Sequence, residues 1–400
     1  MTTMISPEVK TDGPRSSLFT EGKIAGRFRF VSVGDIHLKH PRTPTSLVLN
    51  NLTKYCVNDA VFKNLDIFFI TGDLFDSLLM NNDPRLYEIH RWLTYLLYKC
   101  AEHDVLLRIV EGTPSHDREQ SVFLTEQAVN AKIPVDVHYA TTLSIEYVER
   151  FGIHILYVPD KWRTETTETL GEVKLLLKEK GIDQVDFAVM HGAFEYQLPE
   201  IVPEPSHDSE EYHRLVKCFI LIGHVHKASQ KGRILAAGSF DRDGHGNEEP
   251  KGYYDVTIFS NDDYQITFVE NKDAKKYVGV DCVGLDSRES LIKISNLVST
   301  LPKGSAVKIK CYATDPIFKE YKDLLEAFPY IEFTTDRLRD TREEAKVMEE
   351  LMTLDFDVFK DITPESLPTL LMEEVNSLTS DENQRRRCLE LIESVNTSNA

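Results

Sequence analysis

The sequence lacks an apolar run long enough to cross a membrane, and it lacks the cysteine pattern of a disulfide-rich protein. No stretch of about 18 consecutive apolar residues occurs in the 400-residue chain, so we expect no membrane span. The six cysteines are widely spread and form no CxxC pair. This spacing argues against a disulfide framework and against a cysteine zinc site, and it favours a reducing, cytoplasmic setting.

The chain also has little positive charge. Its formal net charge of −19 repels nucleic acid overall, but phosphate binding needs only local positive charge, which bound cations can supply. Residues 341–400 carry 14 acidic and 6 basic residues, a net of −8. Residues 1–26 lack the apolar stretch of a secretory signal, and we expect a flexible N-terminal extension there.

Strand-like and helix-like segments alternate through most of the chain, which predicts an α/β layered fold with helices packed on the faces of sheets. Runs rich in β-branched and aromatic residues predict buried strands at 28–33, 65–71, 105–110, 153–158, 185–190 and 218–222. Helices are predicted at 45–62, 84–100 and 166–178. Two consecutive strands, 253–259 and 264–270, suggest that a sheet is completed by antiparallel strands.

The remaining sequence predicts two smaller parts. A β-α-β-α-β order indicates a small separate domain, and the segment after it is expected to be helical, with breaks at Pro364 and Pro368. The predicted divisions are an extension at 1–26, a main domain at 27–272, a small domain at 273–338 and a helical tail at 339–400.

Five of the predicted strands are followed by loops that carry Asp or His. One such loop alone is weak evidence, because a turn Asp often caps a helix and a loop His is often simply exposed. Asp35 and His37 stand two residues apart and can point to the same side of an extended loop. The five loops contain Gly34-Asp35-Ile36-His37, Gly72-Asp73-Leu74-Phe75-Asp76, Gly112-Thr113-Pro114-Ser115-His116-Asp117, His191-Gly192 and Gly223-His224-Val225-His226.

Taken together, these loops predict a metal centre. Ligands of open α/β sheets gather outside the strand ends, so these side chains are expected to converge. A mixed set of Asp and His suits Mn, Fe or Zn better than Ca or Mg. Two ions about 4 Å apart can clamp a phosphodiester and activate a water molecule.

The series GDIH, GDLFD, SHD, HG and GHVH resembles the motifs of calcineurin-like metallophosphoesterases. More narrowly, the chain is similar to the SbcD-type nuclease family, because Gly238-Ser239-Phe240-Asp241-Arg242 and Pro250-Lys251-Gly252-Tyr253 follow the GHVH loop as a Gly-Ser…Arg…Lys-Gly-Phe/Tyr pattern does in that family. The resemblance covers about residues 28–335 well and the tail loosely. It implies a two-sheet sandwich flanked by helices, with a DNA-binding α+β cap at 273–338 and a partner-binding tail.

The resemblance also implies roles for the loop residues. One divalent ion, expected to be Mn²⁺, would be held by Asp35, His37, Asp73 and His226. A second would be held by Asp73, as a bridge, with His191 and His224. His116 would give a proton to the leaving oxygen and would be positioned by Asp117. The family usually has Asn where this chain has Ser115, so we expect a weaker ligand and a looser second site.

The resemblance implies a metal-dependent DNA exonuclease or endonuclease subunit that acts in DNA end processing, recombination and repair. It would work as a homodimer with an SbcC-type coiled-coil ATPase, in the cytoplasm, or in the host cytoplasm if the protein is phage-encoded. Three basic groups have two interpretations each, phosphate contacts or a plain solvated face. They are Lys272, Lys275 and Lys276 at the start of the small domain, Lys303, Lys308 and Lys310 within it, and Lys39, His40 and Arg42 after the first loop.

Two other functions are compatible with the same motifs. A small-molecule or nucleotide phosphodiesterase of the same superfamily would not need the additional domain and tail. A non-catalytic scaffold would be expected to have lost ligands, and in this chain only the Ser115 position departs from the family pattern.

Overall fold

The computed structural model describes residues 19–20, 23–24, 27–199, 201, 205–260, 262–338, 367–378, 382 and 385–388. Most of the expected N-terminal extension and of the expected tail lies outside these residues. Among the described helices, none has the length and apolar character that a membrane span requires. The six cysteines all fall within the described residues; they are unpaired, and five of them are buried.

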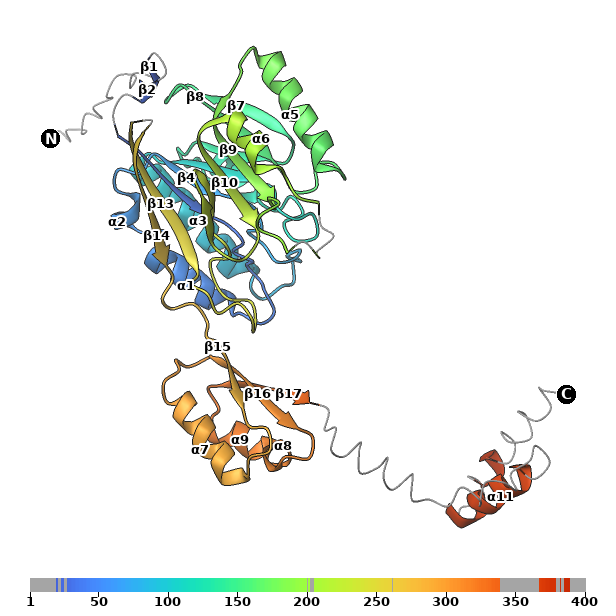
Figure 1. The fold of residues 1–400 in the computed structure, drawn as a ribbon. Helices are drawn as coiled ribbons and strands as arrows, with labels where there is room; N and C mark the ends of the chain where they lie inside the picture. The colour runs from blue at the N-terminus through green and yellow to red at the C-terminus, as the bar shows by residue number, and fades with distance from the viewer. Residues whose placement is uncertain are drawn as a thin grey trace.

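Two mixed six-stranded sheets form the main body, which confirms the predicted α/β class (Figure 1). The first sheet has the order β14 (Asp263–Glu270), β13 (Gly252–Ser260), β3 (Phe28–Val33), β4 (Ile67–Ile70), β5 (Leu106–Val110), β6 (Val137–Ala140). The second has the order β11 (Ser229–Lys231), β12 (Ile234–Ala236), β10 (Val216–His224), β9 (Val185–Gly192), β8 (Ile153–Val158), β7 (Ser144–Val148). A separate pair joins β1 (Phe19–Thr20) to β2 (Lys23–Ile24).

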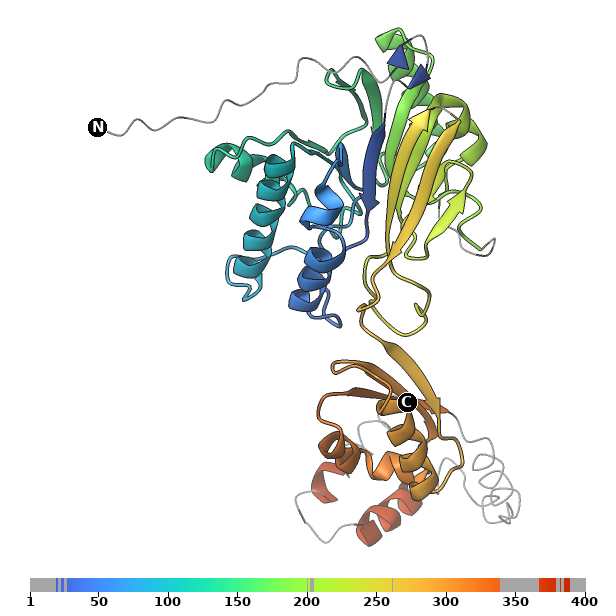
Figure 2. The same cartoon turned by 90° about the vertical axis from the view of Figure 1, so that its left-hand side faces the viewer.

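Helices cover the outer faces of the two sheets. Figure 2 shows the helices of the first sheet beside β3. The helices are α1 (Thr45–Tyr55), α2 (Asp59–Phe62), α3 (Leu86–His103), α4 (Val122–Asn130), α5 (Thr166–Lys180) and α6 (Ser209–Leu215). The sequence prediction joined α1 and α2 into one helix. The structure breaks it because the Asn58 side chain accepts a hydrogen bond from Val61 N and starts a new helix.

Alternating strand residues fill two cores at once. In β3, Phe28 and Phe30 belong to the core that also contains Phe187 and Phe219 of the second sheet. Val31 of the same strand belongs to the core formed with α1 and α3. Successive side chains of a strand point to opposite faces, so a strand buried on both sides is mostly apolar. The structure is therefore layered helix, sheet, sheet, helix, with the innermost core between the sheets.

The expected antiparallel completion of a sheet is confirmed. β13 pairs antiparallel with β3 and with β14, while β3, β4 and β5 run parallel. In the second sheet, β8, β9 and β10 run parallel. The carboxyl ends of β3, β4 and β5, and those of β9 and β10, therefore carry the loops that the sequence analysis selected.

A small three-stranded parallel sheet follows the main body and has its own core. It contains β15 (Tyr277–Asp281), β16 (Ala306–Tyr312) and β17 (Glu332–Leu338), with α7 (Ser287–Val298), α8 (Pro316–Lys319) and α9 (Tyr321–Ala327). Ile294, Ile309 and Phe333 pack within that core. The Lys275 ammonium group lies 2.7 Å from the Glu332 carboxylate and joins this unit to the segment leading into it. A last described helix is α11 (Leu367–Leu378).

The buried His207 gives the main body a predicted pH dependence. Burial lowers the pKa of His207 to about 4. Between pH 6.5 and 4 the unfolded chain binds a proton at this residue that the folded chain does not, so stability present above pH 6.5 is lost as the pH falls. From pH 7.5 to pH 4.5, the wild-type protein should lose roughly 2–3 kcal/mol more unfolding free energy than His207→Phe.

Urea unfolding of both proteins at the two pH values measures this difference. The other titrating groups are common to both, so the comparison isolates His207. Equal losses in the two proteins would contradict the assignment.

Candidate metal centre

The two sheets meet at the strand ends that carry the Asp and His loops. Gly34, just after β3, forms a parallel bridge with Ser239, and Phe240 N donates to Asp35 O. His224 N, at the end of β10, donates to both carboxylate oxygens of Asp35 at 2.8 and 3.0 Å. Hydrogen bonds from backbone N–H groups thus join the carboxyl-terminal strand ends of one sheet to those of the other.

Glycines allow this close approach. A Cβ atom on Gly72 would lie 2.3 Å from His191 Nδ1, and one on Gly223 would lie 2.2 Å from Thr71 O. No real side chain tolerates such distances. Gly72 also has φ of +86°, a conformation that is strained for other residues.

The backbone at the site is held in an uncommon conformation. Asp35, His37 and Asp73 have φ of 48°, 50° and 49°, and His224 has φ of 107°. Non-glycine residues adopt positive φ rarely and at a cost of about 1 kcal/mol or more each. Such strain persists where the surrounding structure imposes it, and in this protein it coincides with four candidate ligands.

The first cluster brings together Asp35, His37 and His226, whose ligand atoms lie within 4.8 Å of one another. His37 Nε2 and His226 Nε2 are only 2.9 Å apart. Two imidazole nitrogens at this distance need a proton or a cation between their lone pairs. Burial lowers the pKa of His37 to about 3, and burial raises the pKa of the enclosed Asp35. A cation at this position would satisfy the carboxylate and both rings.

Asp243 supports the first cluster from behind. Its Oδ2 lies 3.0 Å from His226 Nδ1, which is a contact in which the ring donates and the carboxylate accepts. Burial lowers the pKa of His226, but this hydrogen bond and the charges of Asp35 and Asp243 together raise it. The proton is therefore held at Nδ1, and Nε2 is left to face His37. Asp243 was not predicted from the sequence because it lies in a loop before β13 rather than at a strand end.

The second cluster brings together Asp73, His191 and His224. His191 Nδ1 donates to Thr71 O at 2.7 Å, so its Nε2 faces the Asp73 carboxylate at 3.3 Å. Burial lowers the pKa of His191, but the charge and hydrogen bond of Asp73, together with the charges of Asp35 and Asp160, raise it to about 10. Without a metal ion, a proton on His191 supplies the positive charge that this position attracts.

Asp73 also belongs to a third group, with His37 and His116, and so links the first two clusters. Burial raises the pKa of Asp73, but His191 and the hydrogen bond from His116 lower it, and the net shift is downward. Asp73 is therefore a buried carboxylate between several imidazoles, which is the position expected of a bridging ligand.

His116 lies at the edge of the clusters and is half-buried. Its Nδ1 is 3.0 Å from Asp73 Oδ2, and this hydrogen bond raises the pKa of His116. Both carboxylate oxygens of Asp117 instead accept backbone hydrogens, from Phe75 N and Gly112 N at 2.9 Å each. The His116 ring is thus oriented directly by Asp73, while Asp117 fixes the loop; a role for Asp117 in the reaction stays a prediction.

Ser115 and Thr113 occupy different environments in the same loop. Ser115 is exposed. Thr113 is buried, and its Oγ1 lies 3.1 Å from Asp73 Oδ2 and 3.4 Å from His191 Nε2. The sequence analysis did not select Thr113, although its place directly after Gly112 was a usable signal.

The residues of these clusters fit divalent cations. They supply two buried carboxylates and imidazole nitrogens that face one another, and the rings are oriented by Thr71 and Asp243. The six Asp and His ligands predicted from the strand-end loops lie in the two clusters, whereas Ser115, the seventh predicted ligand, is exposed. A further group, Asp59, Glu102 and His103, differs because it is more exposed and Lys99 already neutralises it.

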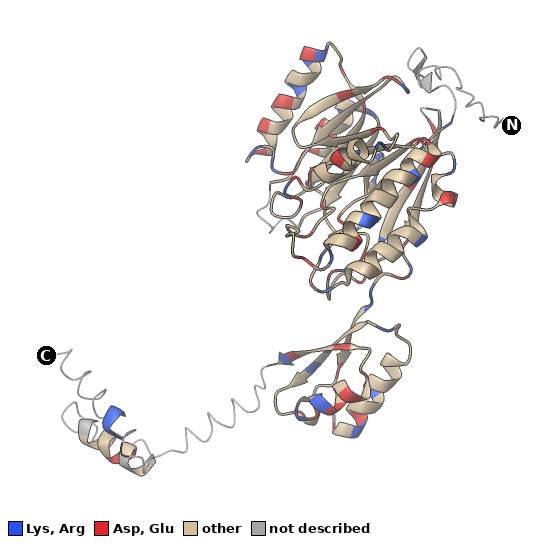
Figure 3. Cartoon of the chain, turned by 180° about the vertical axis from the view of Figure 1, so that it is seen from behind, with Lys and Arg blue, Asp and Glu red and all other residues tan. Residues whose placement is uncertain are grey.

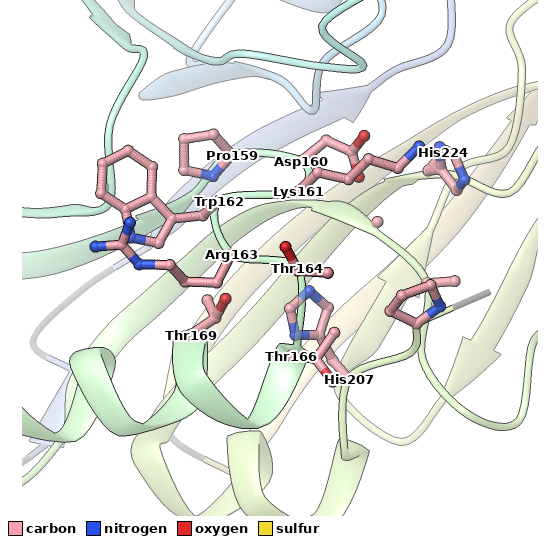
Figure 4. A pocket seen from close by; sticks show the side chains of 13 residues that line it. Pro159, Asp160, Lys161, Trp162, Arg163, Thr164, Thr166, Thr169, His207 and His224 are labelled. Carbon is pink, nitrogen blue, oxygen red and sulfur yellow. The ribbon is translucent and has the colours of Figure 1, made fainter.

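A pocket adjoins the second cluster (Figure 4). It is lined by Asp160, Trp162, His207 and His224, among others, and has a volume of about 30 Å³. Buried Asp160 Oδ2 and His207 Nδ1 have no hydrogen-bond partner among the described residues. This volume holds a water molecule or two, which would satisfy both atoms.

Comparisons with known proteins do not identify a family. No protein-family model and no curated protein matches the chain. Among solved structures, TT1561 of Thermus thermophilus is similar with 11% identity and a TM-score of 0.35, over 62% of this chain and 100% of that one. A further crystal structure shows 10% identity and a TM-score of 0.33, over 61% of this chain and 100% of that one. Likeness this low carries no argument about fold or function.

Because Gly72 is crowded, one methyl group added at this position should strongly lower the stability of the protein. Gly72→Ala should lower the free energy of unfolding by at least about 2 kcal/mol, because the new Cβ collides with His191 and the backbone is strained. Gly171→Ala is the matched control, since Gly171 lies in α5 and a Cβ there would meet no described atom within 4 Å. The control should be stabilising by up to about 1 kcal/mol.

Urea unfolding of the two variants and the wild type provides the measurement. An unchanged unfolding free energy in Gly72→Ala would show that the two sheet edges are not packed as described.

Proposed function

We propose that the protein is a metal-dependent phosphodiesterase that cleaves DNA, and that it belongs functionally with the SbcD-type nucleases. The observation that carries this proposal is the convergence of two Asp and His clusters, joined at Asp73, beside His116. Paired ions with mixed carboxylate and imidazole ligands are typical of phosphoester hydrolysis.

The clusters indicate which residues would hold two divalent ions. We propose that both ions are Mn²⁺. Asp35, His37 and His226 would hold one ion, His191 and His224 the other, with Asp73 between them. Bound ions of this kind would supply positive charge for the phosphate. They would also lower the pKa of a water molecule, so that it could lose a proton at neutral pH and attack phosphorus.

His116 is positioned to handle the proton of the leaving oxygen. Its Nδ1 is engaged by Asp73, so Nε2 is the ring nitrogen left to reach a substrate. The ring is half-buried, whereas the ligands His37 and His191 are buried. These features support a role for His116 in proton transfer rather than in holding a metal ion. In this proposal, Asp117 keeps the loop that carries His116 in place.

The small three-stranded unit supports DNA as the substrate class, because a small phosphodiester would not need it. Its helices pack against one face of the sheet, through Val307 and Ile309. Residues that alternate with these, Lys308 and Lys310, lie on the other face. Acidic and basic residues are interspersed over the whole unit in Figure 3, so any attraction for phosphate would be local.

The candidate lysines of the small unit do not fit the expected role equally. Lys275 is buried against Glu332 and does not offer a contact for DNA. Lys303 and Lys310 are exposed, and Lys308 is partly exposed. We therefore place the proposed DNA contact on the helix-free face of the small sheet.

We also propose a coiled-coil ATPase partner and a homodimer, both by family resemblance. The described part of the predicted partner-binding tail supports a docking role in one respect. Helix α11 exposes apolar side chains, namely Leu367, Leu370, Leu371 and Met372. The other apolar residues of the predicted tail, from Phe356 to Ile362, lie outside the described residues.

His116→Ala should lower DNA cleavage with Mn²⁺ by about 10²- to 10⁴-fold, because the proton donor is lost. Its bound Mn²⁺ should equal that of the wild type. His103→Ala is the control, because it removes a histidine from the exposed Asp59 group and should leave cleavage unchanged.

Cleavage of labelled linear and single-stranded DNA and of a chromogenic phosphodiester, each in Mn²⁺, gives the readout. Hydrolysis of the small ester without DNA cleavage, even with an ATPase partner supplied, would favour a small-molecule phosphodiesterase. Full activity in His116→Ala would contradict the assigned role.

Replacing Lys308 and Lys310 together by Ala should weaken DNA binding and lower the salt dependence of the affinity by about one to two charges. The control is Lys319→Ala with Lys322→Ala, which removes two exposed lysines from the helical side. Binding is measured by fluorescence anisotropy over a range of salt concentrations. Equal salt slopes for the two double variants would contradict a contact on the open face of the sheet.

A further inference from the structure

The loop after β5 contains a tight turn that decides which side chains face the metal centre. Thr113 O accepts hydrogen bonds from His116 N at 2.8 Å and Asp117 N at 3.1 Å. Pro114 holds the second position of this turn, where its fixed φ is favourable, and Ser115 holds the third. The two ends of the turn, Thr113 and His116, both reach Asp73, while the two central residues are exposed.

Thr113 is fixed to Asp73 by two contacts. Its backbone N donates to Asp73 Oδ1 at 2.6 Å, and its Oγ1 lies 3.1 Å from Asp73 Oδ2. Oγ1 is also 3.4 Å from His191 Nε2, which in turn is 3.3 Å from Asp73 Oδ2. Three potential ligand atoms on three residues thus form a nearly equilateral triangle.

The size of this triangle matches the coordination shell of a small divalent ion. With metal–ligand bonds of about 2.1 Å, neighbouring ligands of one ion lie about 3.0–3.4 Å apart. The chemistry matches as well. His191 Nδ1 donates its hydrogen bond to Thr71 O, so Nε2 can offer a lone pair to a cation that replaces its proton, and the Thr113 hydroxyl oxygen has lone pairs of its own. A threonine hydroxyl is an established type of ligand for small divalent cations.

We infer that Thr113 Oγ1, and not Ser115, supplies the oxygen ligand of the second ion, in the place where related enzymes use an asparagine. This inference rests on the proposed two-ion centre. It assigns the second ion Asp73, His191, His224 and Thr113. The weak binding of the second ion that Ser115 would give does not arise, because the ligand oxygen comes from a buried side chain that the turn holds in place.

The test is Mn²⁺ binding, measured by isothermal titration calorimetry and by electron paramagnetic resonance in the absence of DNA. Three variants are compared with the wild type. Thr113→Val keeps the size of the side chain but loses its oxygen. Thr113→Ser keeps the hydroxyl, and Ser115→Ala removes only the exposed hydroxyl.

The wild-type protein, Ser115→Ala and Thr113→Ser should each bind two Mn²⁺ ions and give the resonance signal of a coupled pair. Thr113→Val should bind the second ion roughly 10- to 100-fold more weakly and lose the signal of the pair. A circular dichroism melt shows that each variant is folded. If Thr113→Val unfolds, Ser115→Ala still separates the two candidate ligands, because loss of the second ion in that variant would assign the ligand to Ser115.

Loss of the second ion in Ser115→Ala, with Thr113→Val unaffected, would overturn the inference. So would a wild-type protein that binds one ion or none. The protein could also bind two ions, with the second depending on Thr113, and yet cleave no DNA. That result would uphold the inference and contradict the proposed nuclease function.

Discussion

The Asp73 carboxylate contacts residues from both sheets of the main body. It follows β4 of the first sheet, and its oxygens contact Thr113 and His116 from the same sheet and His191 from the other. A buried carboxylate is stable only when hydrogen bonds and positive charge compensate for lost hydration. That requirement ties the loops after β4, β5 and β9 to one small volume.

The rest of the site is arranged around this requirement. Glycines at 72 and 223 leave space for the His191 ring and for the Thr71 carbonyl. Left-handed backbone at Asp35, His37 and Asp73 turns their side chains inward. Each strained residue costs about 1 kcal/mol or more. The apolar cores on both sides of each sheet hold the strand ends in place and so maintain this strained arrangement.

Much of this arrangement follows from the sequence because the information is local. Each strand of the site is mostly apolar, and the six clustered Asp and His residues lie at the carboxyl end of a strand or directly after it, so both the layers and the clustering of these residues were predictable. Thr113 was missed because adjacency to His116 pointed to Ser115, whereas the turn at Pro114 decides which hydroxyl faces inward. Asp243 and the buried position of Lys275 depend on partners far away in the sequence, His226 and Glu332. Such pairings cannot be derived from local pattern.

The central claim is that the two sheet edges together form one centre for two ions. Anomalous diffraction from crystals soaked in Mn²⁺ tests this claim most directly. Two peaks are expected about 4 Å apart, one among Asp35, His37 and His226 and the other among His191, His224 and Thr113, with Asp73 between them. A single peak, or a peak only at the exposed group of Asp59, Glu102 and His103, would contradict it.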